Sequence, residues 1–241
     1  MILLRSALFN LYFFGLTFVL TLAASAARVA GGRHVAAVGR LWARCLLAGA
    51  RVICGIRVSM EGMEHIPSHG GALIASRHES AFDTFIWMTL LPRCSYVLKQ
   101  ELVRIPLFGP LLTAAGMIAI DRSAGGAALR ALLRAGEAAA REARQIVIFP
   151  EGTRSGHGHP RPLQPGIAAL AVRTGLPVIP VATDSGLCWG RRAFRKRPGT
   201  VRIVIGRPIP PHADRKVLMQ AVAAGISLLD YDPDAPRRSA A

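Results

Sequence analysis

Short apolar runs of strand length alternate with longer helical segments along most of this chain, and this alternation limits the possible fold more than any other feature. The apolar runs are rich in β-branched residues, as buried strands are. They cover Val58–Met60, Ala72–Ala75, Ser95–Leu98, Met117–Ile120, Ile146–Phe149, Val178–Val181 and Val201–Ile205. Helical patterns lie between and after them, near Phe82–Leu90, Pro106–Ala115, Ala124–Arg144, Pro165–Thr174 and Asp214–Leu229. This order predicts an α/β fold in which helices flank a parallel or mixed sheet.

The N-terminal segment is strongly apolar and carries no charged residue from Ser6 to Ala27. About 20 such residues are enough to cross the hydrocarbon core of a bilayer as a helix. A signal peptide is the alternative, because Arg5 precedes the run and Ala24-Ser25-Ala26 resembles a cleavage site. Since the run is longer than the apolar core of a usual signal peptide, we predict a retained membrane anchor.

A second apolar helix is predicted from about His34 to Cys54. Its basic residues fall within about 40° of one another on a helical wheel. They are Arg33, Arg40, Arg44 and Arg51. Such a stripe suits a helix that lies among lipid phosphates, although an ordinary amphipathic helix with a solvated basic face would show the same pattern.

The charge of the chain points to an anionic partner. Lysine and arginine number 30 against 14 aspartates and glutamates, which gives a net charge of +16. Nucleic acid and an anionic membrane surface both attract such a protein. Because 51% of the residues are hydrophobic and no DNA- or RNA-reading motif is present, we predict an anionic membrane surface and no nucleic acid.

Cysteine and histidine spacing gives no sign of a metal site. The cysteines lack paired metal-ligand spacing and are expected to be free thiols; they are Cys45, Cys54, Cys94 and Cys188. His157 and His159 are close together, but their neighbours Ser155, Gly156 and Pro160 are typical of a loop. We therefore predict no metal and no cofactor.

A histidine and a carboxylate follow the strand-like run Ala72–Ala75. His78 and Asp83 are five residues apart, so on one helix they would differ by about 140° and could not meet. They can pair only if the histidine lies in the loop and the helix begins between them, with Ser80 as the expected N-cap. Asp83 would then bind one ring nitrogen of His78 and leave the other as a general base.

An anion clamp is predicted after the run Ile146–Phe149. Gly152 lets backbone amides face an anion, Thr153 adds a hydroxyl and Arg154 adds a bidentate guanidinium. Arg122 follows another strand end and is expected at the same edge of the sheet. Lys99 also lies past a strand end, where a structural ion pair is an equal alternative.

The motifs that are absent narrow the chemistry. The sequence has no G-x-S-x-G elbow, no P-loop and no G-x-G-x-x-G, so a serine hydrolase, a kinase and a dinucleotide enzyme are unsupported. No activated nucleophile accompanies His78. A base beside an anion clamp therefore favours direct attack by a substrate hydroxyl over a covalent intermediate.

Four blocks in order make the sequence resemble the bacterial 1-acylglycerol-3-phosphate acyltransferases, also called lysophosphatidic acid acyltransferases. The match covers about residues 55–215. The first block, His78 to Asp83, resembles the HxxxxD motif of that family. The others are Lys99 to Arg122 (with Pro106, Gly109 and Gly116), Phe149 to Arg154, and Val178 to Val181.

The resemblance implies roles for these residues. His78 would deprotonate the sn-2 hydroxyl of lysophosphatidic acid, with Asp83 orienting it, and the hydroxyl would attack the thioester of acyl carrier protein or acyl-CoA. Pro180 would shape the wall of the acyl-chain site. The glycerol phosphate would be held by Lys99, Arg122, Glu151, Gly152, Thr153 and Arg154. Relatives often carry Asn and Gln on either side of the histidine, where this chain has Arg77 and Glu79.

The resemblance also implies an organisation and a location. We expect a mixed sheet flanked by helices, as in glycerolipid acyltransferases, over a catalytic domain of residues 55–230. The apolar N-terminus predicts membrane-anchoring helices over residues 1–54, and the Pro-, Arg- and Ala-rich C-terminus predicts a disordered tail over residues 231–241. The active site would face the cytoplasm at a bacterial inner membrane. Two alternatives stay open: acylation of another lysolipid such as lyso-ornithine lipid, and a non-catalytic lipid-binding or scaffold protein.

Overall fold

The computed structural model describes residues 1–211 and 214–230, and the tail predicted at 231–241 lies outside this range. Its strands are β1 Ile56–Glu61, β2 Ala72–Ser76, β3 Cys94–Lys99, β4 Ile118–Ile120, β5 Gln145–Ile148, β6 Val178–Thr183 and β7 Gly199–Ile205. Its α-helices are α1 Ile2–Val29, α2 Val35–Cys54, α3 Phe82–Leu90, α4 Phe108–Ala114, α5 Gly126–Arg141, α6 Gly166–Thr174, α7 Ser185–Cys188 and α8 Arg215–Ile226. Short 3₁₀ helices are η1 Met63–His65, η2 Gln100–Arg104 and η3 Arg122–Ala124.

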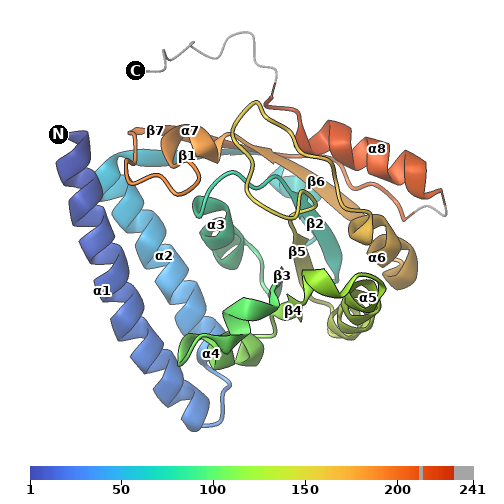
Figure 1. Ribbon diagram of the computed structural model, residues 1–241, viewed down its shortest axis with the longest axis horizontal. Coiled ribbons are helices and arrows are strands. Elements are labelled where there is room, and N and C mark those ends of the chain that lie inside the picture. Colours follow the sequence, from blue (N-terminus) through green and yellow to red (C-terminus); the bar gives the residue numbers. More distant parts are fainter. Residues whose placement is uncertain (212–213, 231–241) are drawn as a thin grey trace.

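All seven strands form one mixed sheet in the order β1-β7-β6-β2-β5-β3-β4 (Figure 1). Neighbouring strands run parallel except β6 and β7, which pair antiparallel. The strands β2, β5, β3 and β6 therefore end at the same edge of the sheet, and the loops after them meet there. This arrangement confirms the predicted α/β class with a mixed sheet.

Helices cover both faces of the sheet because the central strands are apolar on both sides. In β2, Ala72 and Ile74 face the core under α2 and α3, while Leu73 and Ala75 face the core under α5, α6 and α8. Figure 1 shows α1, α2 and α3 on one side of the sheet and α5, α6 and α8 on the other. Pro180 of β6 faces the second side, where it lies against Gly206 and Gly225.

The N-terminal helix packs lengthwise on α2 and takes part in the main core. Phe9 is fully buried and belongs to the same core cluster as Ile74 of β2. Tyr12 fits against Gly49, where a Cβ atom would lie 2.3 Å from its ring, and its hydroxyl donates to the Cys45 carbonyl at 2.9 Å. A glycine at this position therefore allows the close approach of the two helices.

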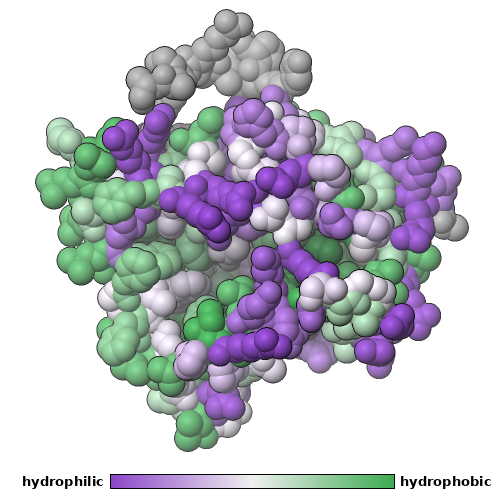
Figure 2. All heavy atoms as spheres, viewed as in Figure 1, coloured by the Kyte–Doolittle hydropathy of each residue, from purple (hydrophilic) through white to green (hydrophobic). Residues whose placement is uncertain are grey.

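The opposite face of α1 is apolar and exposed. Leu11 and Phe18 are 73% and 65% exposed, and Leu4, Leu8 and Phe14 lie on the same side. We call these five residues the α1 ridge. By length and composition, α1 is long and apolar enough to cross a membrane. Figure 2 shows hydrophobic residues along α1, at the left edge of the molecule.

Several helices begin or end at other residues than the sequence predicts. The helix expected at Ala124–Arg144 is α5, Gly126–Arg141, because Ala143 takes a positive φ of 54°. The second N-terminal helix begins at Val35, so Arg33 precedes it, while Arg44 and Arg51 are exposed. The helix α7 and the 3₁₀ helices are too short to be predicted from periodicity.

Candidate active site

His78 and Asp83 pair in the loop between β2 and α3. The loop leaves β2 at Ser76, and α3 begins at Phe82, so the two side chains lie on either side of the helix start. His78 Nδ1 lies 3.2 Å from Asp83 Oδ2, and the same oxygen accepts the backbone amides of Glu79 and Ser80 at 2.8 Å each. The carboxylate therefore holds both the loop and the ring. The pairing predicted from the sequence is present.

The expected N-cap needs a correction. The residue before α3 is Ala81, and it makes no side-chain cap bond. Ser80 lies one position earlier, where its Oγ accepts the Phe82 amide at 3.1 Å. Ser80 thus satisfies the first helical amide from one position before the N-cap, while Asp83 accepts the Glu79 and Ser80 amides, which precede the helix.

The segment after β5 holds the backbone and the ring of His78. The Glu151 carboxylate accepts the His78 amide at 3.0 Å, and the Ser155 amide donates to the His78 carbonyl at 2.8 Å. The Phe149 ring stacks on the imidazole with centroids 3.9 Å apart. Since Nδ1 is directed at Asp83, Nε2 is the nitrogen available to a substrate.

A tight turn at Gly152 brings Arg122 to the same place. Gly152 has a φ of +73°, its amide donates to the Phe149 carbonyl at 2.9 Å, and its carbonyl accepts a hydrogen bond from Arg122 Nη1. A side chain at this φ would strain the backbone. The glycine amide is therefore used inside the turn, and Thr153 and Arg154 are left to face a ligand.

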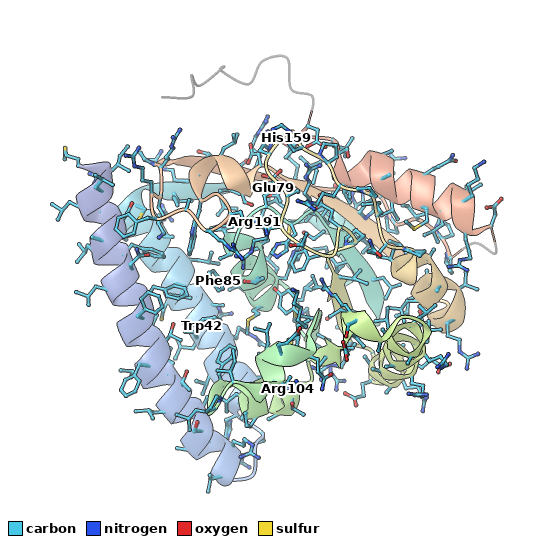
Figure 3. All side chains as sticks on the ribbon, viewed as in Figure 1. Trp42, Glu79, Phe85, Arg104, His159 and Arg191 are labelled. Atoms are coloured by element: carbon cyan, nitrogen blue, oxygen red, sulfur yellow. The ribbon has the colours of Figure 1, made fainter. Side chains whose placement is uncertain are left out.

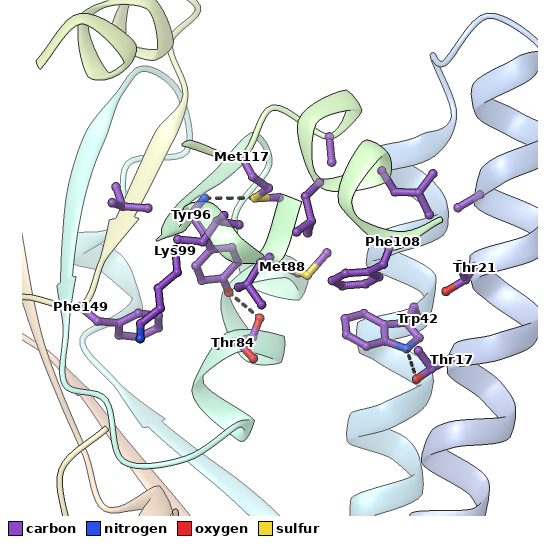
Figure 4. Close-up of a pocket in the computed structure, with 18 of the residues that line it drawn as sticks. Thr17, Thr21, Trp42, Thr84, Met88, Tyr96, Lys99, Phe108, Met117 and Phe149 are labelled. Atoms are coloured by element: carbon purple, nitrogen blue, oxygen red, sulfur yellow. Dashed lines mark hydrogen bonds between the residues drawn. The ribbon is translucent and has the colours of Figure 1, made fainter. Parts of the chain in front are cut away.

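These residues open into a cavity of about 490 Å³ that reaches the N-terminal helices. Figure 4 shows Lys99 and Phe149 at one end and Trp42 and Phe108 at the other. The polar end is lined by His78, Lys99, Arg122, Thr153, Arg154, Arg191 and Arg192. The apolar end is lined by residues of α1, α2, α3 and α4, among them Leu20, Val38, Trp42, Met88, Phe108 and Leu111.

Hydrogen bonds fix the walls of the apolar end. Trp42 Nε1 donates to Thr17 Oγ1 at 2.9 Å, which joins α2 to α1 (Figure 4). The Tyr96 hydroxyl donates to the Thr84 carbonyl at 2.7 Å (Figure 4). Polar groups on these walls are therefore paired with one another, and the lumen beside them is apolar.

Arg77 and Glu79, which flank the base, are turned away from it into a buried ionic network. Arg77 Nε lies 3.2 Å from Glu79 Oε1, and Arg77 Nη1 binds the carboxylate of Asp230. Glu79 is 0% exposed and also accepts His157 Nδ1 at 3.1 Å and the Gly186 amide at 3.0 Å. Figure 3 places Glu79 under the loop that carries His157 and His159. The charges of Arg77 and Glu79 thus neutralise each other.

The same network disfavours a metal ion held by Glu79, His157 and Asp230. Ligand atoms of Glu79, His157 and Asp230 lie within 4.8 Å of one another. The guanidinium of Arg77 contacts both carboxylates, so it already occupies the place of a cation. His157, which the sequence places in a loop, is therefore a hydrogen-bond partner of the buried Glu79.

Stability should depend on pH through His157. Its hydrogen bond with Glu79 raises its pKa above the usual value of 6.5, against the opposing effect of burial. A raised pKa adds stability that is fully present below about pH 6.5 and is lost as the pH rises through the folded-state pKa. Burial raises the pKa of Glu79 as well, which acts in the same direction. We expect H157Q to lower the melting temperature more at pH 6 than at pH 8.5.

Circular dichroism melting of both proteins at the two pH values measures this difference. H159Q is the matched control, because His159 is exposed on the same loop. An H157Q deficit that is equal at both pH values would contradict the assignment.

The structure brings together most of the predicted site residues. Those that line the cavity are His78, Lys99, Arg122, Thr153 and Arg154, with Asp83 directly behind His78. Glu151 and Gly152 do not line it, since their polar groups hold His78 and Arg122. Pro180 faces the opposite side of the sheet, so its implied role in the acyl-chain wall is wrong.

Sequence reasoning missed two cavity residues, Arg191 and Arg192. They lie between α7 and β7, and the basic run Arg191, Arg192, Arg195, Lys196 and Arg197 was the signal that could have found them. Burial lowers the pKa of Arg154, Asp83 acts in the opposite direction, and Arg191 and Arg192 lower it further by repulsion.

The α/β domain places a histidine–aspartate pair at the end of a partly apolar cavity, an arrangement suited to acyl transfer to a hydroxyl. Residues 57–184 match the acyltransferase family, so the chain belongs to that family. The 1-acyl-sn-glycerol-3-phosphate acyltransferase of Pseudomonas aeruginosa is 39% identical over 165 residues, which cover 68% of this chain and 64% of the relative. The human 1-acyl-sn-glycerol-3-phosphate acyltransferase alpha is 31% identical over 209 residues, 83% of this chain and 72% of the relative.

A solved structure confirms the fold. The 1-acyl-sn-glycerophosphate (LPA) acyltransferase of Thermotoga maritima superposes with a TM-score of 0.74, over 93% of this chain and 94% of that chain, at 22% identity. The N-terminal helices are included in a match of this extent. The aligned region spans just under two thirds of the P. aeruginosa relative's length.

Proposed function

We propose that this protein transfers an acyl chain from acyl carrier protein or acyl-CoA to the sn-2 hydroxyl of lysophosphatidic acid, giving phosphatidic acid. The observation that carries the proposal is the position of His78 at the basic end of a cavity whose other end is apolar. Such a cavity matches an amphiphilic substrate with a phosphate and an acyl chain. The names of the relatives support the same reaction.

The chemistry follows from the geometry of His78. Its Nε2 takes the proton of the sn-2 hydroxyl, and the oxygen bonds to the thioester carbonyl carbon. The tetrahedral adduct collapses with cleavage of the carbon–sulfur bond, and His78 returns the proton to the departing sulfur. Asp83 keeps Nδ1 protonated and stabilises the imidazolium between these steps.

Lys99, Arg122, Thr153 and Arg154 would hold the phosphate beside the base. Guanidinium and ammonium groups bind phosphate through charge-assisted hydrogen bonds. A zwitterionic acceptor such as lyso-ornithine lipid would leave part of this positive charge unbalanced. The basic end of the cavity therefore favours lysophosphatidic acid.

A purified assay tests the acceptor and the donor together. Lysophosphatidic acid and lyso-ornithine lipid are each offered with acyl-CoA and with acyl carrier protein, and products are separated by chromatography. We expect phosphatidic acid as the main product. Transfer to lyso-ornithine lipid alone, or no transfer to either acceptor, would contradict the proposal.

We also propose that the protein works on the cytoplasmic face of a bacterial inner membrane, with the α1 ridge in the lipid. Large apolar side chains on one face of a helix bind the acyl region of a bilayer. The apolar end of the cavity is partly lined by the other face of α1, which would let an acyl chain reach the cavity from the bilayer.

Loss of two ridge residues should weaken membrane binding without unfolding the domain. We expect L11E/F18E to lower partition into phosphatidylglycerol-containing vesicles at least about tenfold, because two apolar side chains leave the lipid. The matched control is V217E/L228E, which places the same charges at exposed apolar positions in α8 and just beyond it. Vesicle sedimentation measures both variants, and equal losses would contradict the role of the ridge.

A further inference from the structure

The polar end of the cavity carries more positive charge than the predicted clamp accounts for. Five basic residues line it: Lys99, Arg122, Arg154, Arg191 and Arg192. Among the residues described at 1–211 and 214–230, no aspartate or glutamate lines the cavity. Within the same ranges, no carboxylate lies within 4 Å of Arg154, Arg191 or Arg192 to form an ion pair.

The two unassigned arginines come from a different part of the chain than the clamp. Thr153 and Arg154 follow β5, whereas Arg191 and Arg192 follow α7. Figure 3 shows Arg191 near the centre of this face, between the N-terminal helices and the sheet. Figure 2 shows the surrounding hydrophilic residues as a band across the centre of the face.

The loop that carries them is anchored at both ends by packed residues, while the side chains of Arg191 and Arg192 are exposed at the cavity. Trp189 stacks edge-on against Phe9 with ring centroids 5.4 Å apart. Lys196 is 3% exposed; its amide donates to Ser6 Oγ at 2.9 Å and its Nζ to Asn10 Oδ1 at 2.5 Å. Between these anchors Arg192 takes a positive φ of 56°, which few residues other than glycine adopt without strain.

Like charges gathered around a cavity that no carboxylate lines repel one another, and an anionic ligand relieves that repulsion. We propose that Arg191 and Arg192 form a second anion subsite, which binds a phosphate ester of one of the two substrates. This inference rests on the proposed function, in which both substrates carry such a group. The phosphate belongs either to the lysolipid headgroup or to the phosphopantetheine and nucleotide portion of the acyl donor.

Steady-state kinetics of R191Q/R192Q test the subsite and identify the source of the phosphate. Glutamine keeps most of the side-chain length and removes the charge. The assay uses acyl-CoA and lysophosphatidic acid in neutral detergent micelles, so that membrane binding does not enter. The matched control is R195Q/R197Q, which removes the same charge from exposed residues of the same loop that do not line the cavity.

We expect R191Q/R192Q to raise the KM of one substrate about tenfold or more, with kcat within about threefold of wild type. A rise for lysophosphatidic acid assigns the subsite to the headgroup, and a rise for acyl-CoA assigns it to the donor. R191K/R192K should recover part of the loss, since charge is restored without the bidentate geometry. Unchanged KM values, or equal changes in the control, overturn the subsite.

The two proposals fail in different ways. If wild type does not acylate lysophosphatidic acid, the proposed function fails before any variant is compared. If wild type is active and the variant keeps both KM values, only the subsite fails. Circular dichroism melting of the variants verifies that each is folded.

Discussion

His78→Ala should lower kcat by about 10³ to 10⁴ while leaving membrane binding unchanged. The variant loses the group that takes the hydroxyl proton, and general-base catalysis together with the acid step of thiol release accounts for losses of this size. Phosphatidic acid formation at saturating substrate measures kcat, and vesicle sedimentation measures binding. Because His78 is partly exposed at the end of a cavity, removal of its ring should cost little of the fold.

His69→Ala is the control for this variant. His69 is exposed in the loop before β2 and does not line the cavity. Its activity should equal that of wild type. Turnover within tenfold of wild type in His78→Ala would reject a histidine base and with it the mechanism.

Asp83→Asn should lower kcat by about 10² to 10³ with both KM values nearly unchanged. The change removes the negative charge that stabilises the imidazolium and allows the amide to turn its NH₂ toward Nδ1, which disfavours the required tautomer. Because Oδ2 makes all three contacts, the backbone support survives only in the other amide orientation, in which the asparagine oxygen takes the place of Oδ2 and the charge alone is lost. A kcat loss at constant KM marks a residue that acts through His78.

Asp214→Asn separates this effect from loss of helix capping. Asp214 caps α8 by accepting the Lys216 and Val217 amides at 2.8 and 3.1 Å, far along the chain from the base. Asp214 is exposed and Asp83 is buried, so Asp214→Asn should lower the melting temperature less, and activities are compared well below both melting transitions. If Asp214→Asn lost as much activity as Asp83→Asn, Asp83 would be structural only.

The sheet was predictable because its strands are short, apolar and separated by helices. Ile146–Phe149 and Val178–Val181 are buried on both faces, and such runs are unambiguous when glycine, proline and helices bound them. The antiparallel pairing of β6 with β7 was not predictable. Strand order depends on contacts between distant segments, and no local pattern around Gly199–Ile205 encodes its direction.

Site residues that lie in one loop were predictable from their spacing. The direction in which a side chain points was not. The spacing of His78 and Asp83 required a helix start between them, and the structure has one. Glu151 has the residue type of a site residue, but its carboxylate turns to the His78 amide, 73 residues away in sequence. Only the folded chain shows which of two sides a carboxylate faces.

Pro180 and Arg191 show two further limits. The side faced by Pro180 follows from strand parity, because Ile179 and Val181 both face the core under α3. Strand alternation alone would therefore have placed Pro180 on the side away from the cavity, contrary to the role that the family resemblance implied. Arg191 belongs to no motif, and its place at the cavity depends on the packing of Trp189 against Phe9.

The bonds from Lys196 to Ser6 and Asn10 have a consequence for attachment to lipid. They make α1 part of the support of the loop that carries Arg191 and Arg192. Any free energy that lipid contributes to ordering α1 is then shared with that loop, and a ligand that orders the loop must strengthen attachment by the same factor. A foreign transmembrane helix fused in place of α1 would restore residence at the membrane but would break this reciprocity, so location alone should not restore turnover.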